Sequence, residues 1–307
     1  MSPKKSNNSV FIANPIYDVV FRYLMEDNLS ARMFIGVVLG VEVLELEFKP
    51  TDSTHKITGT ENIVTVTRMD FNARIKDEKH GERLVIIELQ KAQYHHQIMR
   101  FRKYLGKQYQ KPGNKIKEET PLPIFPIYIL GDAFTEEEIP VIRVNRQYVN
   151  AATQEIIEKK YVFIESLTHD AVVIQINRLK QNRRTRLERF LSIFDQTAKT
   201  EDSDGHILEI NQSEYPEEYE RIIRRLESVV GSPKLEETMD MEDEILSEFN
   251  LRDKKLAEQK EIAERAENKV RKMILSLYKP DMTLVQIADI SGLSVSEAEE
   301  IILKVKE

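Results

Sequence analysis

The chain of 307 residues contains no cysteine. This absence excludes a disulfide framework, a zinc site built from thiolates and a cysteine nucleophile, and it is typical of proteins in a reducing compartment. The sequence also lacks an uninterrupted apolar run of about 18 residues, the length that indicates a membrane-spanning helix. Its first 15 residues lack the apolar stretch of a signal peptide. We therefore expect a cytoplasmic protein with no membrane partner.

Charge is unevenly distributed along the chain, whose formal net charge is −7. Residues 1–196 carry 29 Lys and Arg against 25 Asp and Glu, whereas residues 197–307 carry 16 against 27. An acidic surface is a poor match for the phosphate backbone of a nucleic acid. Because the acidity lies in the C-terminal third, the N-terminal two thirds remain compatible with phosphate binding.

The spacing of apolar residues predicts an α/β domain over residues 1–196. We expect one helix from about residue 16, a second that ends at Gly40, and strands over 43–48, 63–75 and 83–90. The last two strands are predicted to form a hairpin around a polar turn at 76–81. The remaining predicted elements are a helix over 94–110, a buried strand over 123–130, strand-like pieces over 141–176 that include 161–164, and a basic helix over 178–194.

Residues 197–307 are predicted to be an all-α region. Residues 197–206 are polar and acidic, which is typical of a linker, so we place the domain boundary after residue 196. Helices are expected over 215–230 and 241–278, and the second has opposite charges three and four residues apart. Such a long charged helix indicates a coiled coil or dimer arm, so we expect a homo-oligomer through the C-terminal helices.

The end of the chain resembles a helix-turn-helix, with helices expected over 283–291 and 294–305 around Gly292. Ile287 and Leu293 are expected to pack the two helices together. Three glutamates in the second helix would meet phosphates unfavourably, so we interpret the element as a packing or oligomerisation module. The best candidate for phosphate contact is instead the basic segment with Arg183, Arg184 and Arg186, although a solvated helix face explains it equally simply.

Two carboxylates interrupt the predicted hairpin. Asp70 lies in an apolar neighbourhood, and Glu88 follows Val85, Ile86 and Ile87 directly. A carboxylate is costly to bury unless it is paired or binds a metal. Antiparallel pairing would bring Asp70 beside Glu88 and Gln90 on one face, where a divalent cation would relieve the repulsion between the acids. The alternative is an edge strand whose acids face solvent or pair with nearby arginines.

Several short segments, in their order and spacing, resemble the PD-(D/E)XK nuclease superfamily, and more closely its transposase-like branch, the recombination-promoting nuclease family. The resemblance covers roughly residues 10–195. The matching segments are 14–22 (NPIYDVVFR), 69–71 (MDF), 87–90 (IELQ), Arg100 with Tyr104, and 126–129 (PIYI). The resemblance implies a restriction-endonuclease-like core, in which a mixed central sheet is flanked by helices.

The resemblance also implies a metal site. Asp70 and Glu88 would be catalytic metal ligands for Mg²⁺ or Mn²⁺, the backbone carbonyl of Leu89 would be a third ligand, and Asp18 would assist directly or through water. Gln90 stands where the superfamily usually has lysine, which is common in this branch. Gln90 would help to position water, but it offers only an amide.

Arg100 and Tyr104 lie four residues apart, so they share a face of the predicted helix over 94–110. The resemblance makes them candidates for phosphate contact, and a structural Arg–Tyr pair is the alternative.

These observations predict a Mg²⁺-dependent DNA endonuclease of the transposase type, which hydrolyses phosphodiester bonds. Two alternatives remain open. One is a nuclease-fold protein that binds nucleic acid or regulates without cleaving it. The other is an oligomeric scaffold whose C-terminal helices carry the function.

Overall fold

The computed structural model describes residues 8–49, 55–58, 63–66, 71–91, 95–117, 120–179, 185–277 and 283–299. The chain divides into two compact units, residues 1–242 and 243–307. Among the described residues, no helix has both the length and the apolar character needed to cross a membrane.

A mixed sheet of six strands forms the centre of the first unit, in the order β10–β11–β9–β6–β5–β2. Its strands are β2 (Val43–Phe48), β5 (Phe71–Asp77), β6 (Gly81–Gln90), β9 (Ile124–Leu130), β10 (Val141–Val144) and β11 (Ala171–Gln175). The strands β2, β5 and β6 are antiparallel, whereas β9 lies parallel to both β6 and β11. The structure thus confirms a mixed sheet, and the predicted hairpin is its β5–β6 pair.

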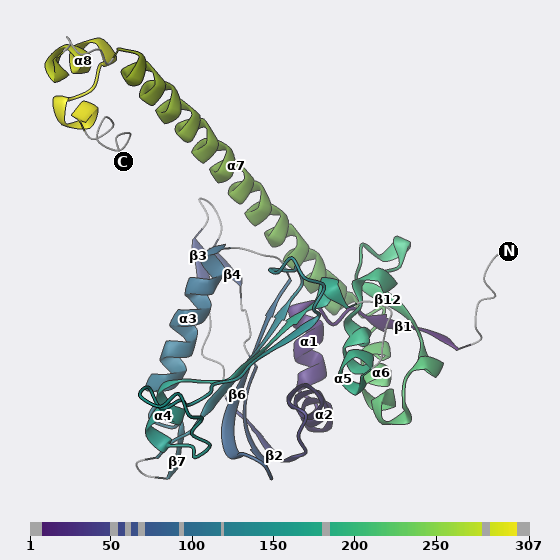
Figure 1. The fold of residues 1–307 in the computed structure, drawn as a ribbon. Helices are drawn as coiled ribbons and strands as arrows, with labels where there is room; N and C mark the ends of the chain where they lie inside the picture. The colour runs from purple at the N-terminus through teal and green to yellow at the C-terminus, as the bar shows by residue number, and fades with distance from the viewer. Residues whose placement is uncertain are drawn as a thin grey trace. The chain divides into compact units, whose positions relative to one another are not determined.

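Helices cover both faces of this sheet (Figure 1). One face packs on α1 (Asp18–Met25) and α2 (Asn28–Leu39), and the other packs on α3 (His95–Gln110). The first face contributes Val85, Ile87 and Leu89 to the large apolar cluster of the unit, while Leu84 and Ile86 join a smaller cluster with α3. Alternate residues of β6 therefore serve different layers, as the pleat of a strand requires.

The first unit extends beyond the predicted boundary at residue 196. The strands β1 (Ser9–Ala13) and β12 (Ile207–Asn211) pair antiparallel, so the second predicted region is not all-α. The buried side chain of Asn14 donates to the Gly205 carbonyl at 2.7 Å, and its backbone N–H donates to the His206 carbonyl at 2.8 Å. Residues 197–206 are therefore packed as a part of the first unit, despite their linker-like composition.

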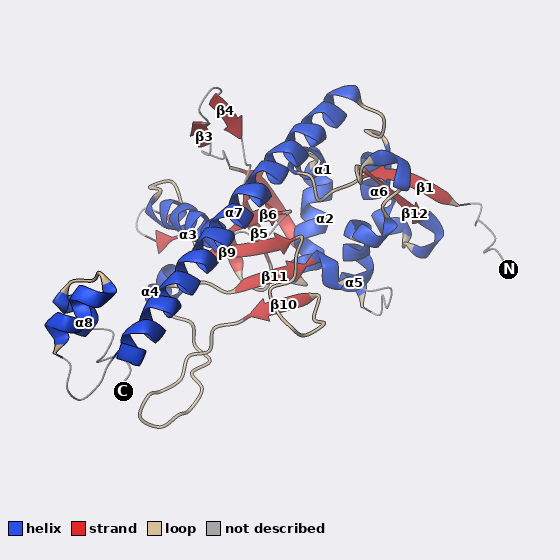
Figure 2. Ribbon diagram, turned by 90° about the horizontal axis from the view of Figure 1, so that it is seen from above, coloured by secondary structure: helices blue, strands red, loops and turns tan. Residues whose placement is uncertain are grey.

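Helix α6 (Glu220–Glu227) also packs on the first unit, since Ile222, Ile223 and Leu226 lie in its large apolar cluster. The elements between β11 and α6 are short: η1 (Ile176–Arg178), α5 (Arg186–Leu191), η2 (Ser192–Phe194), η3 (Gln196–Ala198), η4 (Glu201–Ser203), η5 (Gln212–Glu214) and η6 (Glu217–Tyr219). Figure 2 shows α5, α6, β1 and β12 on the side of the sheet where α1 and α2 lie.

Two local predictions were wrong. Residues 161–164 were predicted as a strand, but α4 (Val162–Leu167) begins there. The continuous helix predicted over 178–194 is interrupted: Leu179 is extended, residues 180–184 lie outside the described part, and Thr185 starts α5 with a capping box that includes Glu188. A capping residue inside an apparently helical pattern was the sequence signal for this break.

Among the described residues, three two-stranded sheets lie outside the central sheet. Besides β1 with β12, these are β3 (His55–Thr58) with β4 (Ile63–Val66), and β7 (Lys115–Lys117) with β8 (Thr120–Pro121).

The second unit consists of most of α7 (Pro233–Leu277) and of α8 (Leu284–Ser291) with the residues that follow it. Gly292 ends α8 in a left-handed conformation, at φ 71°, as predicted. Ile287 and Ala288 are buried with Ala298, and Leu293 packs against them. The predicted packing around this turn is confirmed.

Candidate functional site

The candidate site is built on β6, the strand between β5 and β9. Glu88 is only 5% exposed, although it carries a carboxylate. It lies on the same face as Leu84 and Ile86, which pack against α3. The sequence alternative, in which Glu88 faces solvent on an edge strand, is therefore wrong for this residue.

Tyr128 of β9 lies opposite Glu88 in the parallel β6–β9 ladder. Its ring lies 4.3 Å from that of Phe101 on α3, measured between centroids. Burial and the nearby charge of Glu88 raise the pKa of Tyr128 well above its ordinary value. The hydroxyl therefore stays protonated at neutral pH, and the space between sheet and α3 combines apolar walls with a buried carboxylate.

The end of β6 is held in place by its neighbour strand. The Gly131 N–H, just after β9, donates to the Gln90 carbonyl at 2.7 Å. A Cβ at position 131 would lie 2.1 Å from the Lys91 carbonyl oxygen, so only glycine fits there. Gln90 itself is half-buried and lies on the face of Glu88.

Lys91 points to the other face of the sheet. Its Nζ lies 3.3 Å from the centroid of the Tyr17 ring, in a cation–π arrangement. Tyr17 directly precedes α1, so this contact brings the beginning of that helix to the end of β6. The first-helix acid, Asp18, therefore lies near the end of β6, on the side of the sheet opposite Glu88 and Gln90.

The backbone of Asp18 is also tied to the beginning of α7. Its N–H donates to Glu242 Oε2 at 3.1 Å, which places an anion at the positive end of α1. His206 packs edge-on against Tyr17, at 5.0 Å between ring centroids, and lies 3.8 Å from Asp240.

Helix α3 covers the site face and carries the two residues that were candidates for phosphate contact. Tyr104 is 9% exposed, and its hydroxyl accepts a hydrogen bond of 2.5 Å from Nδ2 of Asn72. Arg100 lies one turn before Tyr104 on the same helix. Tyr104 thus contributes to the interior of the site, between sheet and helix.

Sequence reasoning missed Asn72. It lies on β5 opposite Ile86, on the face that packs against α3, and it is 2% exposed. The signal was present: a polar residue stands between Phe71 and Ala73 in a predicted strand, just as Glu88 interrupts β6.

Several predicted site residues lie outside the described part of the chain, namely Asp70, Arg183 and Arg184. Within the described part, no group of three His, Asp or Glu side chains is arranged to hold a metal ion. The side-chain oxygens that the structure places on the site face include those of Glu88, Gln90 and Asn72. Oxygen donors of this kind suit Mg²⁺ or Mn²⁺.

Arg186 begins α5 and is paired with an acid. Its guanidinium donates to both carboxylate oxygens of Glu218, at 3.2 and 2.9 Å. Because this pair is exposed at the surface, it neutralises locally the positive charge that the sequence pattern offered to phosphates.

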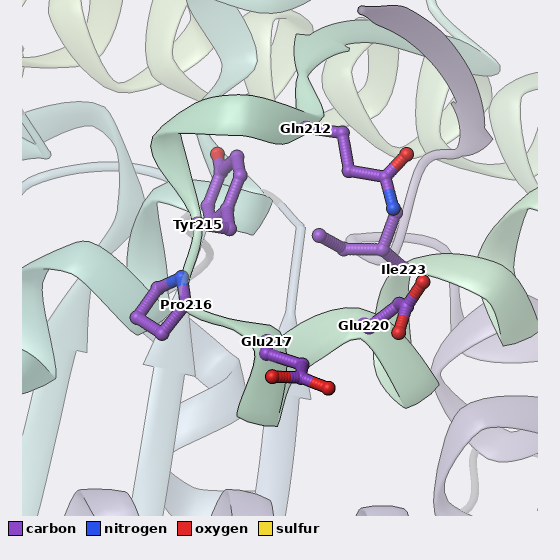
Figure 3. A pocket seen from close by; sticks show the side chains of 6 residues that line it. All are labelled: Gln212, Tyr215, Pro216, Glu217, Glu220 and Ile223. Atoms are coloured by element: carbon purple, nitrogen blue, oxygen red, sulfur yellow. The ribbon is translucent and has the colours of Figure 1, made fainter.

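The surface pocket shown in Figure 3 has different chemistry. It measures about 370 Å³ and is lined by Gln212, Tyr215, Pro216, Glu217, Glu220 and Ile223. None of the predicted site residues lines it, and its two glutamates disfavour an anionic ligand.

The long helix α7 has exposed apolar side chains, including Leu251, Leu256 and Ile262. They are compatible with the predicted oligomer, which stays a prediction.

Comparisons of the chain with models of protein families, with curated proteins and with solved structures gave no significant match.

Proposed function

We propose that this protein is a metal-dependent endonuclease that hydrolyses phosphodiester bonds in DNA and has a restriction-endonuclease-like core of the transposase-like branch. The observation that carries the proposal is the buried carboxylate of Glu88, two residues before Gln90 on the same face of a central strand. A carboxylate and an amide oxygen on one face of a strand are hard oxygen ligands of the kind that suit Mg²⁺ or Mn²⁺.

The topology supports this proposal. The antiparallel strands β2, β5 and β6 lead through α3 to β9, which lies parallel to β6. This is the element order that the sequence resemblance implies for the nuclease core.

Asp70 would provide the second carboxylate. It directly precedes β5 in the sequence, and the first pair of the β5–β6 ladder is Phe71 with Ile87. In this proposal Asp70, Glu88 and the Leu89 carbonyl bind the ion, with Asp18 as an additional acid from α1. The bound ion would activate water and stabilise the charge of the phosphodiester transition state.

Gln90 would orient the attacking water through its amide, which both donates and accepts hydrogen bonds. The Glu88 carboxylate would bind the ion, while the apolar side chains of α3 exclude bulk water from that side.

Plasmid cleavage in Mg²⁺ or Mn²⁺ tests the proposal. We expect Glu88→Gln and Asp70→Asn to lower the cleavage rate at least about a hundredfold, since even residues that only support a metal ligand typically contribute 10–100-fold. Glu82→Gln is the matched control, because Glu82 lies on the same strand and pairs with Arg74 away from the site. Equal cleavage by wild type, Glu88→Gln and Glu82→Gln would contradict the proposal.

The second candidate is a nuclease-fold protein that binds DNA without cleaving it. Gln90 stands where the superfamily usually has lysine, and the neighbouring Lys91 lies against Tyr17 on the opposite face. Lys91 therefore does not replace that lysine at the site, which favours binding without cleavage. Gel-shift assays across a salt series, with no cleavage in any metal, would support this candidate.

A further inference from the structure

The amide of Asn72 is buried and only half satisfied. Its Nδ2 donates to the Tyr104 hydroxyl at 2.5 Å, but its Oδ1 has no hydrogen-bond partner in the described part of the chain. Buried polar atoms in folded proteins nearly always have a partner, so an exception calls for an explanation. A ligand that binds this oxygen is one such explanation.

The bond to Tyr104 determines which way the amide points. With Nδ2 bound to the hydroxyl on α3, Oδ1 is the atom left for another contact. The hydrogen bond therefore presents a carbonyl-type oxygen, a hard donor of the kind that Mg²⁺ and Mn²⁺ prefer.

The register of the sheet brings this oxygen near Glu88. Asn72 lies opposite Ile86, and Glu88 lies two residues further along β6 on the same face. Such diagonal neighbours are roughly 7–8 Å apart at the backbone. Asn and Glu side chains extend far enough to place one oxygen from each about 2.1 Å from a shared Mg²⁺ ion.

We propose that Asn72 Oδ1 is a ligand of the divalent cation at Glu88, and that Tyr104 is a positioning residue that orients the Asn72 amide. This inference rests on the proposed metal site of the nuclease. It adds a neutral side-chain oxygen from β5 to a site that the sequence assigned to acids and a backbone carbonyl.

Binding of Mn²⁺ alone, measured by titration calorimetry without nucleic acid, tests the proposal. Asn72→Leu keeps the size of the side chain and removes the oxygen, so we expect the Kd for Mn²⁺ to rise about tenfold or more. Asn72→Asp adds a charge at the same position, so we expect the Kd to fall, on the order of tenfold. Tyr104→Phe removes only the orienting hydroxyl and should weaken binding less than Asn72→Leu.

Arg74→Met is the matched control. Arg74 follows Asn72 on the same face of β5, and it pairs with Glu82 rather than with the site. We expect this variant to bind Mn²⁺ like the wild type.

Unchanged Mn²⁺ binding in a folded Asn72→Leu variant would overturn the proposal and leave Asn72 a structural residue or a partner of a buried water. If Asn72→Leu does not fold, Asn72→Asp decides: unchanged or weaker binding than wild type overturns the proposal. A larger loss in Tyr104→Phe than in Asn72→Leu also overturns it. Failure of the wild type to bind Mn²⁺ overturns it together with the metal site, whereas Mn²⁺ binding without DNA cleavage contradicts only the nuclease proposal.

Discussion

The two faces of the central sheet differ in what their buried residues are. On the side of α1 and α2, β6 contributes Val85, Ile87 and Leu89 to an apolar cluster. On the side of α3, Leu84 and Ile86 are followed by Glu88, which is also buried, at 5% exposure. Consecutive side chains of β6 thus point alternately into the apolar cluster and toward the face that carries the candidate site.

The contrast extends to the neighbouring strand. Ala73 and Ile75 of β5 pack in the apolar cluster, whereas Asn72 faces α3 and bonds Tyr104. Burial of polar atoms costs stability unless each atom has a partner. The α3 face therefore includes buried polar atoms whose burial costs stability, whereas the other face is apolar and stabilises the unit.

The largest expected effect compares two adjacent residues. Ile87→Ala removes a buried side chain from the apolar cluster and should lower the free energy of unfolding by about 2–5 kcal/mol, since the space left behind only partly collapses. Glu88→Gln keeps the size of the side chain and leaves no cavity, so it should lower the free energy of unfolding of the metal-free protein by less than Ile87→Ala. Urea unfolding in a chelator measures both.

Equal destabilisation by Ile87→Ala and Glu88→Gln would break the comparison between the two faces. It would mean that the Glu88 side chain contributes as much to the stability of the unit as the apolar side chain of Ile87.

An intermediate loss of stability is expected at the end of β6, beside Gln90. Gly131→Ala would place a Cβ 2.1 Å from the Lys91 carbonyl oxygen, so the backbone beside Gln90 must move. We expect a loss of about 1–3 kcal/mol in unfolding free energy, as for other overpacked sites. The control is Gly106→Ala on α3, where a Cβ meets nothing within 4 Å.

Gly106→Ala should instead stabilise the protein by about 0.5–1 kcal/mol, because alanine favours a helix over glycine. Thermal unfolding of the two variants under the same conditions gives opposite shifts if this account holds. Shifts of the same sign would contradict it.

The smallest expected effect is a pH-dependent change in stability on the side of the sheet that packs on α1 and α2. Asp27 caps α2 by accepting from the Ser30 N–H at 2.9 Å. The side-chain hydrogen bond from Arg221 holds the pKa of Asp27 well below its ordinary value. A carboxyl with a lowered folded pKa stabilises fully above its ordinary pKa, and this contribution is lost as the pH falls through the folded value.

Asp27→Asn should therefore lose little at pH 7 beyond the Arg221 pair, because asparagine also caps helices well. Wild-type stability should fall more steeply than that of Asp27→Asn between about pH 4 and pH 2. Chemical unfolding over that range measures the difference, and parallel curves would exclude a role for Asp27 in acid sensitivity.

Much of the fold was predictable because local signals agreed with it. The hairpin of β5 and β6, the helix end at Gly40 and the turn at Gly292 each follow from patterns of apolar residues and glycine. The boundary at residue 196 was wrong because a polar, acidic segment resembles a linker whether or not distant residues bind it. The contacts of Asn14 with Gly205 and His206 join residues about 190 positions apart, and no local pattern reports them.

The candidate site shows the same division. The alternation along β6 determined that Glu88 and Gln90 share a face, since side-chain direction in a strand follows from its period of two. Only the tertiary structure decided that α3 covers this face and buries Glu88, that Tyr17 meets Lys91, and that Asn72 joins the site. The alternation of side chains along a strand is set by the local sequence, whereas burial depends on which other element packs against that strand.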